Sequence, residues 1–405
     1  MKLERLNYWQ LASVLGTSMG FPAMLVGGVL GEKYGAGCAI VSIVIGNLVL
    51  WLAGLGVTSM SQAGNNAIEN IKRYLGGISG KVAAVILMLA FLVWYAIQIK
   101  GVDLATVHNQ NGRYFDVWLG VAFGLAVAAL GMGGIRLISR VCVVALPVLV
   151  LFTLIMVLAS DGVTFKGTWK FSFFATLSVI VTWLAGTVNL PTFMRHSKVR
   201  ADSFLALSIM SALHMFFEIA AVISGVKTPE GFFNFTIAHD NLFFDAYAVI
   251  FISLFYLCIN LVNIYFASAG WDTLFPFYKH PRKYFVIGLI GTSIFVTLQF
   301  TTSILPPAME FFEFMIGGFI ANLGIVLVID FLIAIVVRHR PRPFDRFVSS
   351  MCWLIGCITT VCVGLWSPDA QDYFFLAGMT ASLLTFILVI FVEETVWAIR
   401  NLYQS

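Results

Sequence analysis

The sequence predicts an all-α polytopic membrane protein, in which a single transmembrane domain of about twelve helices occupies residues 1–405. The chain is 60% hydrophobic and only 11% charged, with a mean hydropathy of +0.93, whereas a soluble domain of this length needs far more charge. Apolar runs of about 18 or more residues recur along the whole chain, and each can cross roughly 30 Å of hydrocarbon as a helix. The alternating pattern of barrel strands is not found, so helices must satisfy the backbone in lipid.

Short polar breaks divide the chain into twelve predicted membrane spans. The longest breaks, near 61–80, 104–116 and 226–242, are expected to be ordinary loops, and no soluble domain is expected. The first apolar run continues past the length of a signal sequence and no Ala-x-Ala site follows it, so we expect no cleavable signal peptide. The spans are 7–30, 37–59, 82–103, 117–133, 141–160, 171–193, 203–225, 243–269, 284–305, 310–337, 347–366 and 374–397.

The distribution of charge predicts the orientation in the membrane. With twelve spans and the N-terminus inside, most Lys and Arg residues fall in cytoplasmic loops, which is the positive-inside pattern. We therefore expect a multi-pass protein of the cell (inner or plasma) membrane with both termini in the cytoplasm. Nucleic-acid binding is not expected, because these charges sit in short loops and not on one soluble face. The cytoplasmic set includes Lys2, Arg5, Lys72, Arg73, Lys81, Arg136, Arg140, Arg195, Lys198, Arg200, Lys279, Arg282, Lys283, Arg338, Arg340, Arg342 and Arg346.

Several function classes find little support in the sequence. A membrane-embedded enzyme would need a clustered nucleophile, base or metal set, and the chain has no Ser/His/Asp spacing, no HExxH and no Cys/His cluster. A sensor would append a soluble signalling domain, and a channel would carry a filter-like loop or a charged ring. We expect no cofactor, and we interpret the cysteines as small core residues without disulfides or a metal site. They are Cys38, Cys142, Cys258, Cys352, Cys357 and Cys362.

Glycine and proline punctuate two predicted spans, five spans apart. The first span holds several glycines between residues 16 and 28 together with Pro22, and the sixth span holds Gly186 and Pro191. Helix breaks at membrane depth free backbone groups for an ion or substrate, so this pattern predicts a 5+5 inverted repeat with discontinuous helices 1 and 6. Ordinary helices remain an alternative, because Gly and Pro are common in membrane helices. The predicted repeats are 7–160 and 171–337, followed by two C-terminal helices within 347–397.

Three spans carry side chains that could bind a flat solute. Trp94 and Gln98 lie four residues apart and so share a helix face in the third span. Trp183 in the sixth span could supply a second stacking face, and Asn260 and Asn263 in the eighth span could bond a nucleobase-like edge. The alternatives are an interfacial Trp, plain helix packing and interhelical hydrogen bonds.

Five short stretches together resemble one transporter family. They are Met-Leu-Val-Gly-Gly-Val-Leu-Gly at 24–31, Ile-Gly-Asn-Leu at 45–48, the run 185–195, Gly-Gly-Phe-Ile-Ala-Asn at 317–322 and Val-Ile-Asp-Phe at 328–331. In order and spacing they are similar to the nucleobase–cation symporter family, the group of cytosine permeases and hydantoin transporters. The similarity covers the first ten spans and implies the leucine-transporter-like fold.

The resemblance implies a role for each candidate residue. In the family, aromatic residues of the third and sixth spans sandwich a planar ring, and Trp94 and Trp183 match them. Gln98 matches the amide one turn on, Asn263 matches the eighth-span amide with Asn260 as its neighbour, and Ala185 and Gly186 match positions whose backbone contacts the substrate. The resemblance implies a symporter that imports a nucleobase (cytosine, another pyrimidine or a purine) or a related heterocycle. A pyrimidine vitamin precursor or an amino acid remains an alternative cargo.

Two coupling ions are compatible with the sequence. The family's sodium site uses first-span carbonyls, here near Gly16 and Gly20, together with eighth-span hydroxyls. At those hydroxyl positions this chain has Cys258, Ile259 and Asn260, which offer Na⁺ fewer hard oxygen ligands. A proton is the other candidate, because His214 and Glu218 lie four residues apart inside the seventh span. A structural bridge between helices is the alternative for this pair.

Overall fold

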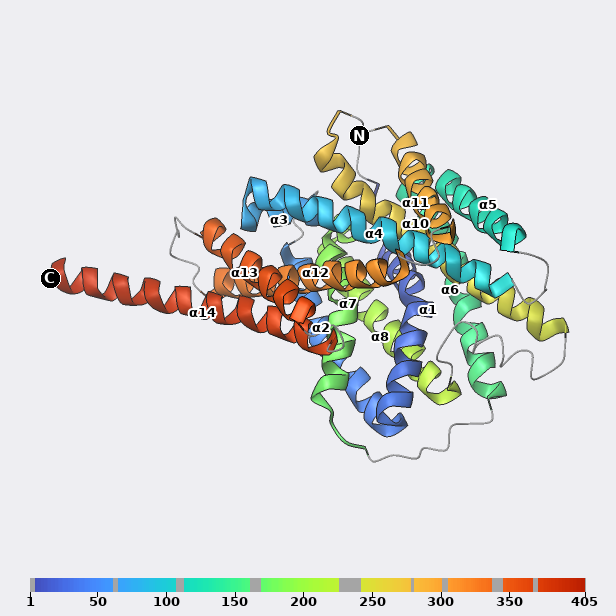
Figure 1. Cartoon of the computed structure of the whole chain (residues 1–405), viewed down its shortest axis with the longest axis horizontal. Helices are drawn as coiled ribbons and strands as arrows, with labels where there is room; N and C mark the ends of the chain where they lie inside the picture. The colour runs from blue at the N-terminus through green and yellow to red at the C-terminus, as the bar shows by residue number, and fades with distance from the viewer. Residues whose placement is uncertain are drawn as a thin grey trace.

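The computed structural model describes residues 4–60, 65–106, 113–160, 169–225, 242–277, 280–300, 305–336, 345–366 and 371–404. These residues form helices joined by short connections (Figure 1). The helices are α1 Tyr8–Tyr34, α2 Ala36–Met60, α3 Ala67–Leu75, α4 Gly77–Thr106, α5 Arg113–Gly131, α6 Gly134–Ala159, α7 Phe173–Met194, α8 Arg200–Ser224, α10 Leu242–Leu274, α11 Arg282–Phe300, α12 Leu305–Val336, α13 Asp345–Trp366 and α14 Gln371–Gln404.

Each predicted span coincides with one of these helices, so the all-α polytopic class is confirmed. In the described residues, ten helices are long and apolar enough to cross a membrane. Shorter apolar stretches, Val117–Gly131 in α5 and Met315–Asp330 in α12, account for the fourth and tenth predicted spans. The last helix, α14, projects from the body of the molecule (Figure 1).

The additional helix, α3, corrects the prediction of an ordinary loop between 61 and 80. The Asn66 side chain accepts a hydrogen bond from the Glu69 backbone N–H at 2.9 Å, and the Glu69 carboxylate accepts one from the Asn66 N–H at 2.7 Å. This reciprocal pair is a capping box, which starts a helix too short and too polar to count as a membrane span.

The structure also differs from the predicted discontinuous helices 1 and 6. Both α1, which contains Pro22, and α7, which contains Pro191, are continuous α-helices. One proline removes only one backbone hydrogen bond, and close packing against neighbouring helices can hold the rest of the ladder together. The inverted repeats, 7–160 and 171–337, stay a prediction.

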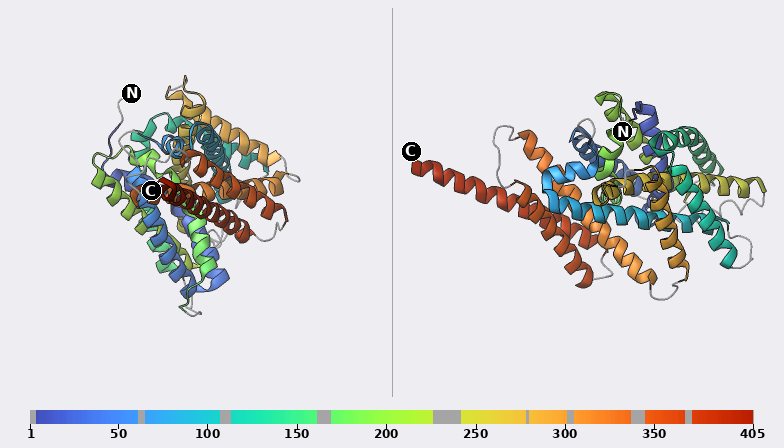
Figure 2. Two further views of the ribbon diagram at one scale, coloured as in Figure 1. Left: turned by 90° about the vertical axis from the view of Figure 1, so that its left-hand side faces the viewer. Right: turned by 90° about the horizontal axis from the view of Figure 1, so that it is seen from above.

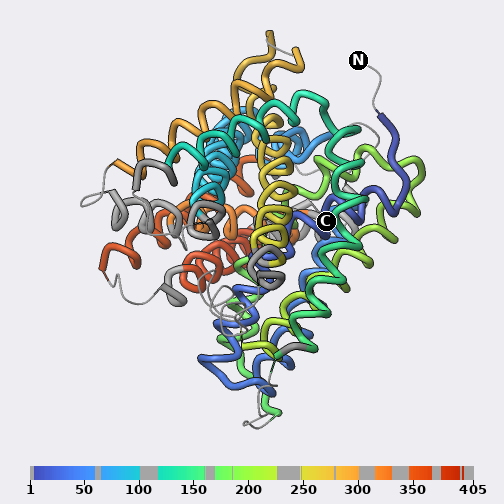
Figure 3. Tube along the Cα trace, turned by 90° about the vertical axis from the view of Figure 1, so that its right-hand side faces the viewer, coloured from blue at the N-terminus to red at the C-terminus, as the bar shows by residue number. Residues whose placement is uncertain are grey.

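The helices pack in two main groups. One group, which we call the bundle, consists of α1, α2, α7 and α8; the other, the scaffold, consists of α4, α5, α10 and α11. Figure 2 shows α1 and α2 in blue beside α7 and α8 in green. In Figure 3 the bundle helices occupy the lower part of the trace and the scaffold helices the upper part. The groups meet where α1 and α7 contact α10, and α12, α13 and α14 pack together to one side.

Candidate substrate and coupling site

A buried carboxylic acid lies at the centre of the bundle. Glu218 of α8 is fully buried, and each of its carboxylate oxygens accepts one hydrogen bond. The Trp183 indole N–H of α7 donates to Oε1 at 2.7 Å, and the Asn47 amide of α2 donates to Oε2 at 2.5 Å. Glu218 therefore joins three helices of the bundle through a single side chain.

His214 completes this group of polar side chains, which we call the acid cluster. It lies one turn before Glu218 on α8, and its ring centroid is 5.2 Å from that of Trp183. The His214 ring is 3% exposed, and its Nε2 atom has no hydrogen-bond partner in the described part of the chain. The predicted His214–Glu218 pair thus shares one cluster, in which both residues contact Trp183.

A second set of buried polar groups, the amide cluster, lies in the scaffold. The Asn263 amide of α10 donates to Gln98 Oε1 of α4 at 2.7 Å, and its distance to Asn260 Oδ1 is 3.4 Å. Asn260 is fully buried, and its own amide nitrogen has no partner among the described residues. The structure brings together all three amides that the sequence singled out. A 2.7 Å amide bond between α4 and α10 suits both interpretations from the sequence, a substrate contact and an interhelical bond.

The predicted aromatic sandwich has one wall in each helical group. Trp94 of α4 is half-buried and meets the edge of Phe91, with ring centroids 5.4 Å apart. Trp183 of α7 is held by the acid cluster. A Cβ atom on Gly186 would lie 2.5 Å from the Met19 methyl group, so this glycine allows α1 to approach α7. The side chain of Ala185 lies outside the described residues. The sandwich itself stays a prediction.

The residues predicted to hold sodium lie in regular, closely packed helix. Because α1 is continuous, the carbonyls of Gly16 and Gly20 lie in an α-helical hydrogen-bond ladder and are not released by a helix break. A Cβ on Gly20 would collide with the Phe255 ring. The Cys258 thiol contacts the Thr17 hydroxyl and the Cys142 thiol, and sulfur is a poor ligand for Na⁺. These positions therefore offer few free oxygen ligands for Na⁺.

Sequence reasoning missed the role of Asn47. The sequence singles it out only as part of the stretch 45–48, yet its side chain is one of two donors to Glu218. An amide within an otherwise apolar span needs a partner, because an unpaired polar group in hydrocarbon costs several kcal/mol. That requirement marks Asn47 as a functional candidate, but its partner lies 171 positions away and cannot be read from the sequence.

A second polar region lies where the N-terminal segment meets the loop after α7. The Leu6 N–H donates to the His196 carbonyl at 2.7 Å, and the Lys198 N–H donates to the Leu6 carbonyl at 3.0 Å. The Arg5 guanidinium adds a bond to the Ser197 carbonyl at 2.8 Å. These contacts fasten the segment before α1 to the segment between α7 and α8.

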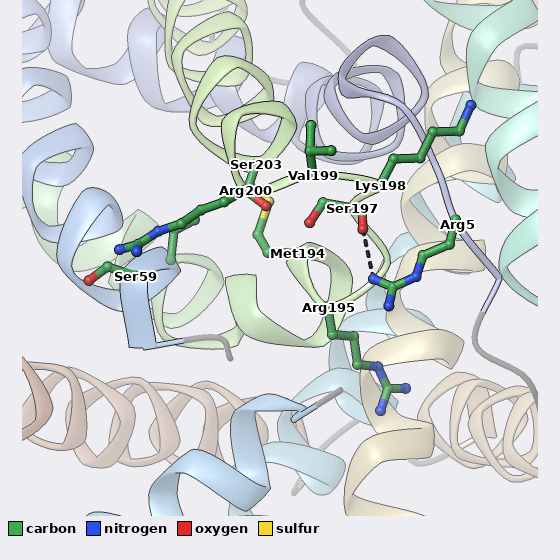
Figure 4. A pocket seen from close by; sticks show the side chains of 10 residues that line it. Arg5, Ser59, Met194, Arg195, Ser197, Lys198, Val199, Arg200 and Ser203 are labelled. Atoms are coloured by element: carbon green, nitrogen blue, oxygen red, sulfur yellow. Dashed lines mark hydrogen bonds between the residues drawn. The ribbon is translucent and has the colours of Figure 1, made fainter. Parts of the chain in front are cut away.

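Beside this contact is a cavity of about 340 Å³ (Figure 4). Its basic side chains do not converge on one point: Arg5 reaches Ser197, whereas Arg195 and Arg200 extend in different directions. Arg195 instead donates to the Tyr265 hydroxyl of α10 at 3.3 Å. The cavity therefore lacks the focused positive charge of an anion site.

His196 links the N-terminal segment to α10 through its two ring nitrogens. Its Nδ1 lies 2.9 Å from the Glu4 carbonyl and its Nε2 lies 2.6 Å from the Tyr265 hydroxyl. A carbonyl only accepts, so Nδ1 carries the proton and Nε2 accepts from Tyr265, which is the neutral ring. Burial, together with the charge of neighbouring Arg195, lowers the pKa of His196 to about 4.

We therefore expect stability to fall as the pH drops from about 6.5, the pKa of an unfolded histidine, to about 4. In that range the unfolded state binds a proton that the native state excludes, so acid favours unfolding. The melting temperature of detergent-purified protein, measured against pH, should fall more steeply for the wild type than for His196→Gln. Parallel curves for the two proteins would contradict this expectation.

Comparison with solved structures finds the same fold in several transporters. Mhp1, a nucleobase-cation-symport-1 family transporter in a closed conformation with bromovinylhydantoin bound, superposes with a TM-score of 0.70 at 15% identity, covering 97% of this chain and 94% of Mhp1. A Na⁺-coupled sialic acid symporter in a substrate-bound outward-open state gives 0.69 at 13% identity, covering 95% and 90%. MhsT in complex with L-phenylalanine gives 0.63 at 12% identity, covering 96% and 99%.

Sequence comparison adds nothing to this structural likeness. No protein-family model matches the chain, and no curated protein sequence matches it. The structural matches extend over nearly the whole chain, so the leucine-transporter-like fold expected from the sequence is confirmed.

Proposed function

We propose that this protein is a secondary active transporter that imports a nucleobase or a related planar heterocycle by cation-coupled alternating access. The observation that carries this proposal is the position of the two polar clusters. The acid cluster, with Trp183, belongs to the bundle, and the amide cluster, with Gln98 and Asn263, belongs to the scaffold. A stacking face on one group and hydrogen-bonding amides on the other suit a flat ring with polar edges.

The two-group packing supports the proposed mechanism. In alternating access, one rigid group rocks against the other around a site near the bilayer midplane. The bundle would move against the scaffold, and a bound ring would contact both groups. Coupling requires that ion and substrate together favour one arrangement over the other. The bound solute named for Mhp1, bromovinylhydantoin, is itself a hydantoin derivative, which agrees with a planar cargo.

We place both termini in the cytoplasm and the protein in the cell membrane. The excess of Lys and Arg in alternate loops supports this orientation. On this orientation, the contact between Leu6 and His196 lies on the cytoplasmic side of the protein. Na⁺ and H⁺ are both candidates for the coupling ion.

The test is ligand-induced thermal stabilisation of the detergent-purified protein. A ligand that binds only the folded state increases the free energy of unfolding by mass action, by about 2.7 kcal/mol at a hundredfold excess over Kd, and so raises the melting temperature. The panel contains nucleobases, hydantoins, pyrimidine vitamin precursors and amino acids, each with and without Na⁺. We expect a planar heterocycle to stabilise the protein.

Tryptophan variants show whether the predicted sandwich holds that ligand. Trp94→Ala and Trp183→Ala should each reduce the shift sharply, because a stacked ring contributes about 1–3 kcal/mol. Trp118→Ala is the matched control: this α5 residue is 71% exposed and should leave the shift unchanged. Stabilisation by amino acids alone, or full shifts in both sandwich variants, would overturn the assignment of a planar cargo.

A further inference from the structure

Glu218 is a buried acid without a counter-charge. It is fully buried in the middle of the bundle, and it accepts hydrogen bonds from the uncharged groups of Trp183 and Asn47. No ion pair involves it among the described residues. Burying an ionised carboxylate costs several kcal/mol, which two N–H donors offset only in part. Binding a proton removes that cost at the expense of one hydrogen bond. Both forms of the acid are therefore accessible.

The charged and titratable groups near Glu218 matter here, because a nearby charge would change how easily it exchanges a proton. Of the helices packed against α8, α1 carries Glu32 and Lys33, both exposed in its last turn. Gly27 of α1 faces Glu218, and Lys33 lies six residues further on, about 9 Å along the helix axis.

The other packed helices bring no charge close to it. The described part of α2 contains no charged residue, and its thiol, Cys38, lies nine residues from Asn47, about 13 Å along the axis. In α6 the charged residues are Arg136 and Arg140, both in its first two turns, and the Cys142 thiol contacts Cys258. Within α7 no residue is charged.

The unpartnered nitrogen of His214 is a second, independent sign of a binding site. This ring is almost completely buried, and a buried imidazole nitrogen without a partner costs about 1–3 kcal/mol. His214 lies one turn from Glu218 and packs on Trp183. A water molecule or an acid proton in this cluster would satisfy the nitrogen.

From this geometry we propose that Glu218 binds the coupling proton, and that its bond to Trp183 links proton binding to the substrate site. The inference rests on the proposed function and deepens it by naming the coupling ion and its ligand. A proton enters from water on the outer side and forms an O–H bond on the carboxylate. It leaves as a proton to water on the inner side, so the carboxylate is restored in each cycle.

Protonation changes the contacts that Glu218 makes to the rest of the bundle. As a carboxylate, Glu218 holds both N–H groups by charge-assisted bonds, which are roughly twice as strong as neutral ones. As an acid, it has one oxygen that becomes a donor and accepts poorly. The bonds to Trp183 and Asn47 then weaken, and α7 and α2 lose a shared anchor on α8.

The experiment compares wild-type protein, Glu218→Gln and Glu32→Gln in proteoliposomes. The solute is a heterocycle that stabilises the wild type, and proton entry is followed with a pH dye inside the vesicles. We expect an acidic exterior to raise accumulation at least about tenfold in the wild type and in Glu32→Gln, with entry of protons. In Glu218→Gln, an acidic exterior should raise neither solute accumulation nor proton entry.

Two outcomes would overturn the proposal. One is accumulation by Glu218→Gln that responds to the pH gradient as the wild type does; the other is wild-type accumulation that responds only to a sodium gradient. If no heterocycle shifts the melting temperature, the proposed cargo fails instead.

The proton site is then still tested without substrate, by infrared difference spectra between alkaline and mildly acidic pH. A carboxylic-acid carbonyl band that is present in the wild type and missing in Glu218→Gln supports the proposal. Identical spectra contradict it. If Glu218→Gln does not fold, proton uptake by the purified wild type on heterocycle binding decides the question, and no uptake overturns the proposal.

Discussion

Gly27→Ala is expected to lower the melting temperature of the protein by several degrees and to abolish transport. Gly27 lies where α1 crosses α8, and a Cβ atom there would lie 2.1 Å from the Glu218 backbone carbonyl oxygen. Backbone cannot rotate aside as a flexible side chain can, so the helices must separate. Overpacking of this kind costs about 1–3 kcal/mol, and membrane helices depend on small residues for close contact.

The same substitution should disturb the acid cluster. Moving the Glu218 backbone away from α1 shifts its carboxylate relative to Trp183 and Asn47, whose donors lie at 2.7 and 2.5 Å. Transport should therefore fall further than the loss of folded protein explains. The measurement is uptake per folded molecule, with the folded fraction taken from size-exclusion profiles in detergent.

Gly77→Ala is the matched control. Gly77 is the first residue of α4, is exposed, and has no atom within 4 Å of the position that a Cβ would take. Alanine is favoured over glycine in a helix by up to about 1 kcal/mol, so this variant should be as stable as the wild type or slightly more so. Equal stability of Gly27→Ala and the wild type would show that α1 and α8 are less tightly packed than described.

Much of the fold could be predicted because the bilayer dictates it. A span must be long, apolar and helical, so the twelve spans followed from hydropathy alone. The short helix α3 was not predicted, because the sequence signal for it is the capping box of Asn66 and Glu69, and hydropathy does not detect capping. The breaks predicted in α1 and α7 did not appear, because Gly and Pro permit an interruption without requiring one.

The candidate site could be predicted only in part. Gln98 and Asn263 were predicted on separate spans, and the structure places them in hydrogen-bond contact. That Glu218 binds Trp183 and Asn47 could not be predicted, because a sequence without aligned relatives does not show which face of one span meets another. A polar side chain within an apolar span predicts that a hydrogen-bond partner exists. Which residue is that partner depends on how the helices pack.

Single removal of either member of the Gln98–Asn263 pair should destabilise the protein more than removal of both. Gln98→Leu leaves the Asn263 amide without its 2.7 Å acceptor, and Asn263→Leu leaves Gln98 Oε1 without its donor. Each unsatisfied group costs about 1–3 kcal/mol, whereas replacing both partners with apolar groups can be nearly neutral. A double-mutant cycle on melting temperature or chemical unfolding should therefore be strongly non-additive.

The control is a buried amide–hydroxyl pair in another part of the fold. Asn322 of α12 donates to the Thr360 hydroxyl of α13 at 2.9 Å. Asn322→Val, Thr360→Val and the double variant should give a cycle of the same sign. None of them should change the thermal shift that a heterocycle produces, because this pair lies outside both polar clusters.

Ligand binding then separates the two interpretations of the amide cluster. If Gln98 and Asn263 bond the heterocycle, the double variant regains stability but shows no thermal shift, because neither of these two amides is left to meet the ring's polar edge. If the pair only ties α4 to α10, the double variant regains the shift along with the stability. The first outcome means that the Gln98–Asn263 bond replaces the substrate's hydrogen bonds when the site holds no substrate. Amides buried in hydrocarbon need partners, so without a ligand they bond to each other. The second would return the amide cluster to the helix packing of the scaffold and leave Trp94 and Trp183 as candidate contacts.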